Sequence, residues 1–396
     1  MPFLFTVRRS QIAYTHPIAV CQLLFAYKVK VLLVSGTFPP MRCGVGDYTG
    51  HLVQALRQRA DIELLVLTSR LVESVGQDPA WLRRIMPTWR IEALPQYLAV
   101  AREFRPDVVH LQYPTQGYRV ATGPILIPML ARLRLGASVV ETWHEFPPRR
   151  FGKETIAMWC LAASAHAVIY VRPDYPKHVS GMLARVLGSA PLRFIPNASV
   201  IPAVQISPSE RSALREQLGC DDRHIISFFG FAHPNKGVDQ LFRIADPEKH
   251  HLLLIGELLE SDTYQQHLRE LAGSDRWRGK VTITGFVEPE RAARLLAVSD
   301  AAVFPFIDGG GVWNSSLHAA MSQGTFAIVT SRERQGYAAE QNIFYAAPGA
   351  VEEMRVALTR YAGNRSAGKL PAVDNAWAEI AHAHAELYRS VMNNEQ

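Results

Sequence analysis

A glycine-rich loop between two apolar segments is the part of this sequence best suited to bind an anion. The segment 303–331 has the pattern strand, loop, helix, strand, and its loop contains Asp308, Gly309, Gly310 and Gly311. Glycines let the backbone approach a ligand closely, because no Cβ atom intervenes. Asn314, Ser315 or Ser316 can cap the helix that follows, whose free N–H groups and partial positive charge suit a phosphate. From this segment alone, an ordinary strand-to-helix turn is the alternative.

Lys236 is the second residue that could contact a phosphate. It lies at the expected start of the helix 237–245, where a point charge adds to the helix dipole and suits a diphosphate. His233 could add a further donor. The alternative for Lys236 is an ordinary surface lysine.

His144 directly follows the predicted strand 137–143, so it is expected at the carboxyl end of a sheet, with Glu141 and Glu145 beside it. A histidine there can bond a sugar hydroxyl or polarise a leaving group. The alternative is a buried histidine hydrogen-bonded to a loop.

The glycines after the first strand do not form a dinucleotide fingerprint. Gly44, Gly46 and Gly50 have the spacing GxGxxxG, and no acidic residue ends the second strand to hold a ribose. NAD binding is therefore disfavoured, and a flexible glycine loop that embraces a substrate is the preferred interpretation.

Several metal and nucleotide motifs are absent from the sequence. It contains no P-loop, no D-x-D and no Cys/His cluster with ligand spacing, so no metal is expected. The remaining histidine pairs are expected at the surface, and these are His250, His251, His382 and His384.

Composition describes an ordinary globular protein of about two or three domains, with 396 residues, 48% hydrophobic and 20% charged. The net charge of +6 is compatible with an anionic ligand, a membrane surface or nucleic acid and selects none of them. Four scattered cysteines favour a reducing cytosol over a disulfide framework. No apolar run reaches the roughly 18 residues needed to span a bilayer.

Strand and helix patterns alternate in two blocks, which predicts an α/β fold of two tandem Rossmann-like doubly wound domains facing a central cleft. The first block has expected strands at 30–35, 62–68, 107–113, 137–143, 167–171 and 192–195, and helices at 47–59, 96–104, 124–135, 153–164 and 176–187. The second has expected strands at 225–229, 252–255, 281–284, 301–306, 325–330 and 343–345, and helices at 237–245, 263–272, 289–298, 315–323, 351–361 and 375–392. Residues 79–95 are expected to be irregular, and the Pro- and Ser-rich segment 196–209 to be a linker.

The predicted domains follow from these blocks. Residues 1–28 are expected to be a disordered extension, with a membrane-touching segment as the alternative. Residues 29–198 form the first domain and residues 199–372 the second. Residues 373–396 are a terminal helix that is expected to cross back to the first domain.

An ordered set of motifs over about residues 29–388 resembles the retaining glycosyltransferases of family 4, which have the GT-B fold. The motifs include TFPPMRCGVGDYT, ETWHEFPP, FFGFAHPNKGVDQLF, VTITGFVEPERAARLLAVSDAAVFPF and SSLHAAMSQGTFAIVTS. The resemblance implies transfer of a sugar from a nucleotide-sugar with retention of configuration and without a metal or other cofactor.

The resemblance also implies roles for individual residues. His144 would bond the transferred sugar, and Lys236 and His233 would neutralise the leaving diphosphate. The rest of the donor site would comprise Gly44, Gly46, Phe286, Val287, Asp308, Gly309, Gly310, Gly311, Asn314, Ser315, Ser316 and His318. Phe286 and Val287 would read the base through their backbone. The acceptor side would comprise Asp47, Tyr48, Gln112 and Tyr113.

The chain departs from the family pattern at three positions. The family's E-x7-E pair falls on Gly310 and His318, so both glutamates are missing. Asp308 is the candidate to replace the first, and His318 to bond the ribose. An arginine is replaced by His233, which cannot make a bidentate contact, and losing such a donor can cost on the order of 3 kcal/mol of transition-state stabilisation.

These expectations lead to a cytoplasmic glycosyltransferase of surface polysaccharide biosynthesis. The acceptor would be a saccharide or a lipid-linked saccharide, the inner membrane face a possible peripheral contact, and nucleic acid no partner. A catalytically silent scaffold of the same fold is the first alternative, and a nucleotide-sugar epimerase or hydrolase is the second. An NAD-dependent dehydrogenase is a distant third.

Overall fold

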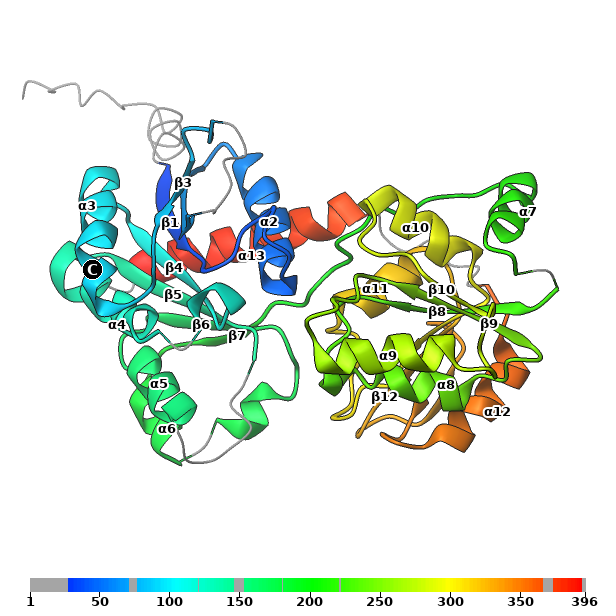
Figure 1. Ribbon diagram of the computed structural model, residues 1–396. Helices are drawn as coiled ribbons and strands as arrows, with labels where there is room; N and C mark the ends of the chain where they lie inside the picture. Colours follow the sequence, from blue (N-terminus) through cyan, green and yellow to red (C-terminus); the bar gives the residue numbers. More distant parts are fainter. Residues whose placement is uncertain are drawn as a thin grey trace, which may run out of the picture.

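The chain folds into two α/β domains that lie side by side, each built on a seven-stranded and mainly parallel sheet (Figure 1). This computed structural model describes residues 28–70, 77–119, 121–145, 153–179, 181–220, 222–365 and 373–393. The predicted pair of doubly wound Rossmann-like domains is confirmed. The extension predicted for residues 1–28 lies outside the described residues, except for Lys28.

The first sheet is wholly parallel and has the strand order β3-β2-β1-β4-β5-β6-β7. Its strands are β1 (Val29–Val34), β2 (Ile62–Ser69), β3 (Leu82–Met86), β4 (Val108–Tyr113), β5 (Ser138–Trp143), β6 (Ala167–Tyr170) and β7 (Leu192–Phe194). Helices cover both faces, which explains why the central strands are continuous apolar runs. The strand order reverses between β1 and β4, the kind of position where ligands bind in open parallel sheets.

Strand β3 was not predicted, because residues 79–95 were expected to be irregular. It pairs in parallel with β2, beginning with Val66 opposite Leu82. Two of its five residues are arginines and it lies at the sheet edge, so it carries only a short apolar signal.

Five α-helices in the described part of the first block flank this sheet. They are α2 (Gly44–Arg57), α3 (Leu94–Phe104), α4 (Gly123–Leu130), α5 (Lys153–Ala162) and α6 (Gly181–Leu187). Helix α2 begins at Gly44, three residues earlier than predicted, so Gly44 and Gly46 belong to its first turn and not to a flexible loop. Glycine is a weak helix former, yet both residues belong to the helix here, and Gly46 is buried.

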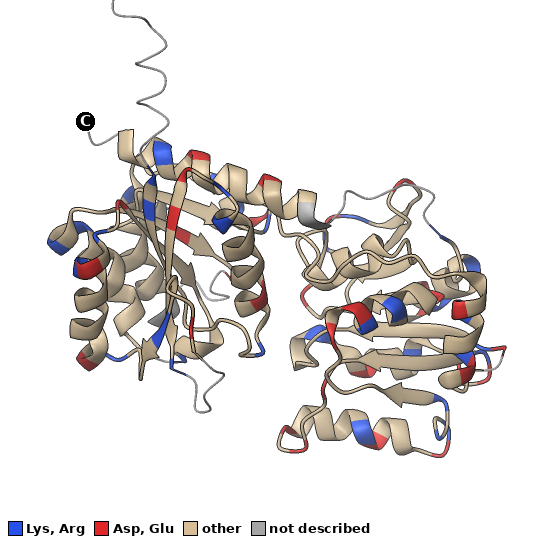
Figure 2. Ribbon diagram, turned by 90° about the horizontal axis from the view of Figure 1, so that it is seen from above, with Lys and Arg blue, Asp and Glu red and all other residues tan. Residues whose placement is uncertain are grey.

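The second sheet has the order β10-β9-β8-β11-β12-β14-β13, and only its edge strand β13 is antiparallel. Its strands are β8 (His224–Phe229), β9 (His250–Ile255), β10 (Val281–Ile283), β11 (Ala301–Phe304), β12 (Ala327–Thr330), β13 (Gly336–Ala338) and β14 (Ile343–Ala346). The helices are α7 (Pro208–Gln217), α8 (Leu241–Ile244), α9 (Thr263–Gly273), α10 (Pro289–Val298), α11 (Ser315–Ser322) and α12 (Val351–Tyr361). Lys, Arg, Asp and Glu lie mainly on helices and loops around the strands (Figure 2).

Helix α7 was missed, although its start carries a readable signal. Ser207 and Glu210 form a capping box, in which the Ser207 side chain accepts from the Glu210 backbone and Glu210 accepts from the Ser207 backbone. None of the α7 side chains is buried, so the helix has no apolar stripe that periodicity could reveal.

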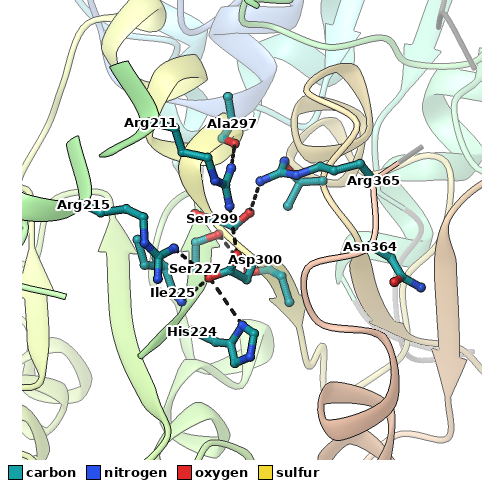
Figure 3. A network of polar contacts seen from close by, with 12 residues as sticks. Arg211, Arg215, His224, Ile225, Ser227, Ala297, Ser299, Asp300, Asn364 and Arg365 are labelled. Atoms are coloured by element: carbon teal, nitrogen blue, oxygen red, sulfur yellow. Dashed lines mark hydrogen bonds and ion pairs between the residues drawn. The ribbon is translucent and has the colours of Figure 1, made fainter. Parts of the chain in front are cut away.

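Asp300, at the amino end of β11, connects α7 to the second sheet through hydrogen bonds, as Figure 3 shows. Its carboxylate accepts from Arg211 at 2.8 Å, from Arg215 at 2.9 Å and from the backbone N–H of Ile225 at 2.8 Å. Near Asp300, Arg365 donates a hydrogen bond to the Ser299 carbonyl. This network lies at the opposite end of β11 from the glycine-rich loop.

The last helix, α13 (Val373–Asn393), packs against α2 and so returns to the first domain after the second is complete (Figure 1). Trp377 and Tyr388 lie in the same core cluster as β1 and α2. His384 is fully buried there, and His250 and His251 are buried at β9, so the prediction of surface positions is wrong for these three. His382 is exposed, as expected.

Candidate functional site

Lys236 lies where the loops at the carboxyl ends of the two sheets approach each other. It belongs to a short 3-10 turn after β8, while Glu145 follows β5 and Arg172 follows β6. Burial lowers the pKa of Lys236, Glu145 raises it and Arg172 lowers it, so these charges from the first domain act on the lysine. Its Nζ also lies 4.7 Å from the centre of the Phe306 ring.

The turn that carries Lys236 is held against the end of β11 by a glycine. Gly237 has a φ of +63°, which favours glycine, and a Cβ there would lie 2.3 Å from the carbonyl oxygen of Pro305. The backbone N–H of Ile307 also donates to the Asn235 carbonyl at 3.0 Å. Lys236 is therefore fixed beside the glycine-rich loop. The helix predicted for residues 237–245 is present as a 3-10 turn, Val238–Gln240, that continues into α8.

The glycine-rich loop is tightly packed. The N–H of Gly310 donates to the Thr330 carbonyl at 2.7 Å, and the N–H of Gly311 donates to Oδ1 of Asn314 at 2.9 Å. A Cβ on Gly310 would lie 2.2 Å from Cδ2 of Phe306. The Asn314 side chain thus bonds the loop. Asn314 is the N-cap residue of α11, but its side chain does not cap that helix.

Ser315 and Ser316 form the first turn of α11, as predicted, and both are partly exposed. Neither hydroxyl has a hydrogen-bond partner within the described part of the chain. A Cβ on Gly230, at the end of β8, would lie 3.9 Å from Cβ of Ser316. The end of β8, the Lys236 turn and the start of α11 thus form one surface with free hydroxyls, a helix N-terminus and a cation, which can bind a diphosphate.

His318 lies differently from what its predicted role as a hydrogen-bond donor to the ribose requires. The ring of His318 donates from Nε2 to the Val312 carbonyl at 2.5 Å, so that nitrogen is occupied by the loop itself. Burial lowers the pKa of His318, which keeps the ring neutral. Asp308 lies at the surface, with 3.5 Å between its Oδ1 and Nη2 of Arg332.

On the first domain, His144 is partly exposed at the end of β5. Its Nε2 lies 2.7 Å from Oε1 of Gln112, and its carbonyl accepts from the hydroxyl of Tyr175 at 2.7 Å. Its ring contacts the Tyr48 ring edge-on, with 4.9 Å between centroids. Burial, with a smaller contribution from His384, lowers the pKa of His144 to about 3, so the ring is neutral.

Two predicted acceptor residues, Gln112 and Tyr48, are too buried to contact an acceptor. Gln112 is fully buried and both ends of its amide are bonded, one to His144 and the other to His110. Tyr48 is 4% exposed. Neighbouring Tyr113 is partly exposed and its ring stacks on that of Tyr118.

A cavity of about 470 Å³ lies between the domains and brings together three predicted residues, Asp47, Phe286 and Val287. Its walls are mainly apolar and aromatic and include Phe38, Val53, Trp81, Phe229, Phe231 and Ala292. Burial raises the pKa of Asp47 to about 6. The lining includes neither His144 nor Lys236. His233 lies just outside it, with its ring stacked on that of Phe231.

Contacts between the domains were missed by sequence reasoning. Arg42 pairs with Glu257, and its guanidinium carbon lies 4.3 Å from the centre of the Phe286 ring. The guanidinium carbon of Arg172 lies 5.2 Å from the centre of the Trp313 ring. The backbone carbonyl of Trp313 accepts from the side-chain amide of Asn197 at 2.8 Å. No local pattern could have revealed these pairs, because their members lie far apart in the sequence.

The described residues contain neither a metal-binding cluster nor a membrane-spanning helix. No group of three or more His, Cys, Asp or Glu side chains there could hold a metal ion. No helix in those segments is both long and apolar enough to cross a membrane.

Comparison with known proteins gives structural matches only. No protein-family model matches the chain, and no curated protein matches it in sequence. Sucrose-phosphate synthase from Thermosynechococcus elongatus is similar in structure, with a TM-score of 0.67, 16% identity, and coverage of 93% of this chain and 100% of that one.

Two further structures support the same fold. HepE from Anabaena, solved with UDP and glucose, has a TM-score of 0.64 and 16% identity over 92% of this chain and 99% of its own. WaaG, a glycosyltransferase involved in lipopolysaccharide biosynthesis, has a TM-score of 0.60 and 15% identity over 92% and 98%. The chain therefore has the GT-B glycosyltransferase fold, and this prediction is confirmed.

Proposed function

We propose that this chain transfers a sugar from a nucleotide-sugar to a saccharide or lipid-linked acceptor, with retention of configuration and without a metal. The observation that carries the proposal is the surface formed by Lys236, the glycine-rich loop and the start of α11. It lies at the carboxyl end of the second sheet of a GT-B fold. HepE, which has a similar fold, was solved with the nucleotide-sugar UDP-glucose.

The diphosphate would lie against α11. Lys236 and the N-terminus of α11 would stabilise the negative charge that develops as the nucleoside diphosphate leaves. The hydroxyls of Ser315 and Ser316 would donate to phosphate oxygens. Gly310 and His318 supply no carboxylate, so the mechanism depends on this electrostatic stabilisation.

The other donor and acceptor groups would extend from this point into the cleft. The base would lie at Phe286 and Val287, in the aromatic cavity. His144 would contact the transferred sugar from the first domain. Asp47, whose pKa is raised to about 6, would be ionised at neutral pH and would accept a hydrogen bond from the acceptor hydroxyl.

A surface on the first domain supports a peripheral membrane contact. Met129, Leu133, Ile156 and Met182 are exposed apolar side chains on or beside the neighbouring helices α4, α5 and α6. Arg132 and Arg134 are exposed next to Leu133. Apolar side chains flanked by basic ones suit an anionic lipid surface, which fits a lipid-linked acceptor and surface polysaccharide synthesis.

A catalytically silent donor-binding protein is the second candidate. One observation favours it, because the Gly310 position cannot hold any side chain without moving Phe306. The chain would then bind a nucleotide-sugar without cleaving it.

The test is to incubate the protein with UDP-, GDP- and ADP-sugars in EDTA, with and without glycolipid extract, and to follow nucleotide release. The proposal predicts acceptor-dependent release and an anomeric NMR signal that shows retention. Donor binding without release, even with added Mg²⁺, would establish the silent binder. Equal release with and without acceptor would indicate a hydrolase.

A further inference from the structure

A chain of buried polar side chains leads from His144 through the first sheet to the C-terminal helix. Nε2 of His144 lies 2.7 Å from Oε1 of Gln112, and Nε2 of Gln112 lies 3.0 Å from Nε2 of His110. Nδ1 of His110 lies 2.7 Å from the hydroxyl of Tyr388 on α13. Gln112, His110 and Tyr388 are all fully buried.

The amide of Gln112 fixes the direction of these hydrogen bonds. A carbonyl oxygen can only accept, so the proton between His144 and Gln112 must be on Nε2 of His144. The amide nitrogen donates to Nε2 of His110, which therefore bears its proton on Nδ1 and donates it to the oxygen of Tyr388. Thr142, whose Oγ1 lies 2.8 Å from Nε2 of His110, donates to the same nitrogen.

A second set of contacts links α13 to His144 through Tyr48. Nδ1 of His384 donates to the Ile380 carbonyl at 2.7 Å, so its Nε2 is the acceptor for the hydroxyl of Tyr48, 3.5 Å away. Tyr48 presents its ring to His144. The histidine at the cleft is thus oriented by two side chains that are themselves oriented by the C-terminal helix.

We infer that Gln112, His110 and Tyr388 are positioning residues that hold His144 as the Nε2–H tautomer and leave its Nδ1 as a hydrogen-bond acceptor. Nδ1 has no partner elsewhere in the described segments. This inference rests on the proposed function, in which His144 would accept a hydrogen bond from a hydroxyl of the bound sugar. It would not donate to the leaving diphosphate.

The lowered pKa values agree with this arrangement. Burial lowers the pKa of His110 well below its usual value, with His384 and His144 adding to the effect. The pKa of His384 is lowered to about 4, mainly by burial. All three rings are therefore neutral at pH 7, so their tautomers, and not their charges, determine what they offer to a ligand.

The direct test is nitrogen-15 NMR of the histidine rings in the full-length, ligand-free protein at pH 7, with His144→Asn used to assign the His144 signals. The inference predicts a protonated Nε2 and a bare Nδ1 on His144. A proton on Nδ1, or a mixture of the two tautomers, would overturn it. This measurement needs no substrate, so it stands even if the proposed transferase activity is not found.

Variants test the chain of positioning residues. Tyr388→Phe should shift the His110 and His144 ring signals, whereas Tyr97→Phe should not. Tyr97 is an equally buried tyrosine whose hydroxyl has no partner among the described residues, so it is a matched control. Equal spectra for Tyr388→Phe and the wild type at both rings would contradict the role of Tyr388.

Gln112→Leu is the sharpest substitution, because it removes both the oxygen that accepts from Nε2 of His144 and the N–H that donates to Nε2 of His110. Gln112→Leu should lose the single tautomer and lower kcat roughly 10- to 100-fold, as the loss of a partner that orients a metal-ligating histidine does. A Gln112→Leu variant that folds and keeps the wild-type tautomer would refute the role of Gln112.

Discussion

A Cβ atom on Gly310 would lie 2.2 Å from Cδ2 of Phe306, so the loop has no room for a side chain at the position where the resembling family has its first glutamate. Phe306 also lies beneath the ammonium group of Lys236. Any side chain at position 310 must therefore displace the ring that contacts the candidate phosphate-binding lysine.

Gly310→Ala should accordingly lower both stability and nucleotide affinity. Overpacking of this kind costs about 1–3 kcal/mol of unfolding free energy, measurable by urea denaturation. Gly44→Ala is the matched control, because a Cβ there meets nothing within 4 Å and alanine favours the first turn of α2. A Gly310→Ala protein as stable as Gly44→Ala would show that the loop is not packed as described.

Glu141 should make the protein less stable as the pH rises. It is fully buried on β5, and burial raises its pKa from 4.5 to about 8, while the indole N–H of Trp143 donates to it. Between these values the unfolded state releases the proton and the folded state keeps it. The unfolding free energy should therefore fall by at most about 1.4 kcal/mol per pH unit from pH 4.5 to pH 8.

Glu141→Gln should remove this slope, and urea denaturation of both proteins at pH 5, 6, 7 and 8 measures the difference. Exposed Glu103→Gln is the control, which should keep the wild-type slope. Parallel stability curves for wild type and Glu141→Gln would contradict a neutral buried Glu141.

Asp300→Ala should destabilise the second domain strongly, because it leaves Arg211 and Arg215 without their carboxylate. Removing one member of a buried charge network costs about 3–5 kcal/mol. Differential scanning calorimetry should show a lower melting temperature, whereas exposed Asp308→Ala should show little change. Nucleotide affinity of folded Asp300→Ala protein should be retained, since the network lies at the far end of β11.

The exposed apolar surface of the first domain should bind anionic membranes. Leu133 is 71% exposed between two arginines, and Leu133→Glu should reduce co-sedimentation with phosphatidylglycerol vesicles several-fold. Val356→Glu on α12, which alters another exposed apolar residue, should not. Equal binding by both variants, or no preference for phosphatidylglycerol over phosphatidylcholine, would rule out this surface.

The sequence predicted the secondary structure well where buried apolar residues follow one another in a continuous run. The apolar runs of β1, β4 and β11 predicted both sheets, because strands covered on both faces have no polar alternation. Strand β3 and helix α7 lack a strong apolar pattern and were missed. Helix α2 starts three residues before its predicted position, because Gly44 and Gly46 are weak helix formers that nevertheless belong to its first turn.

Side-chain partners were the least predictable part of the site. Gln112 was expected to face the acceptor, but its amide nitrogen bonds His110, which in turn bonds Tyr388, 278 residues further along the chain than His110. A signal for the buried His384 existed, since Trp377, Ile380, His384, Leu387 and Val391 repeat at helical spacing. The contacts of Arg42 and Arg172 with the second domain depend on the packing of two domains, for which a single sequence has no local signature.

Nucleotide binding at Lys236 tests the central claim most directly. The measurement is a thermal-shift titration of wild type, Lys236→Met and Lys249→Met with UDP, GDP and ADP in EDTA, where Lys249 is an exposed lysine at the amino end of β9. One nucleotide should stabilise wild type and Lys249→Met by about 2.7 kcal/mol at 100 times its Kd, and Lys236→Met far less. No stabilisation by millimolar nucleotide, or equal stabilisation of all three proteins, would contradict a donor site at Lys236.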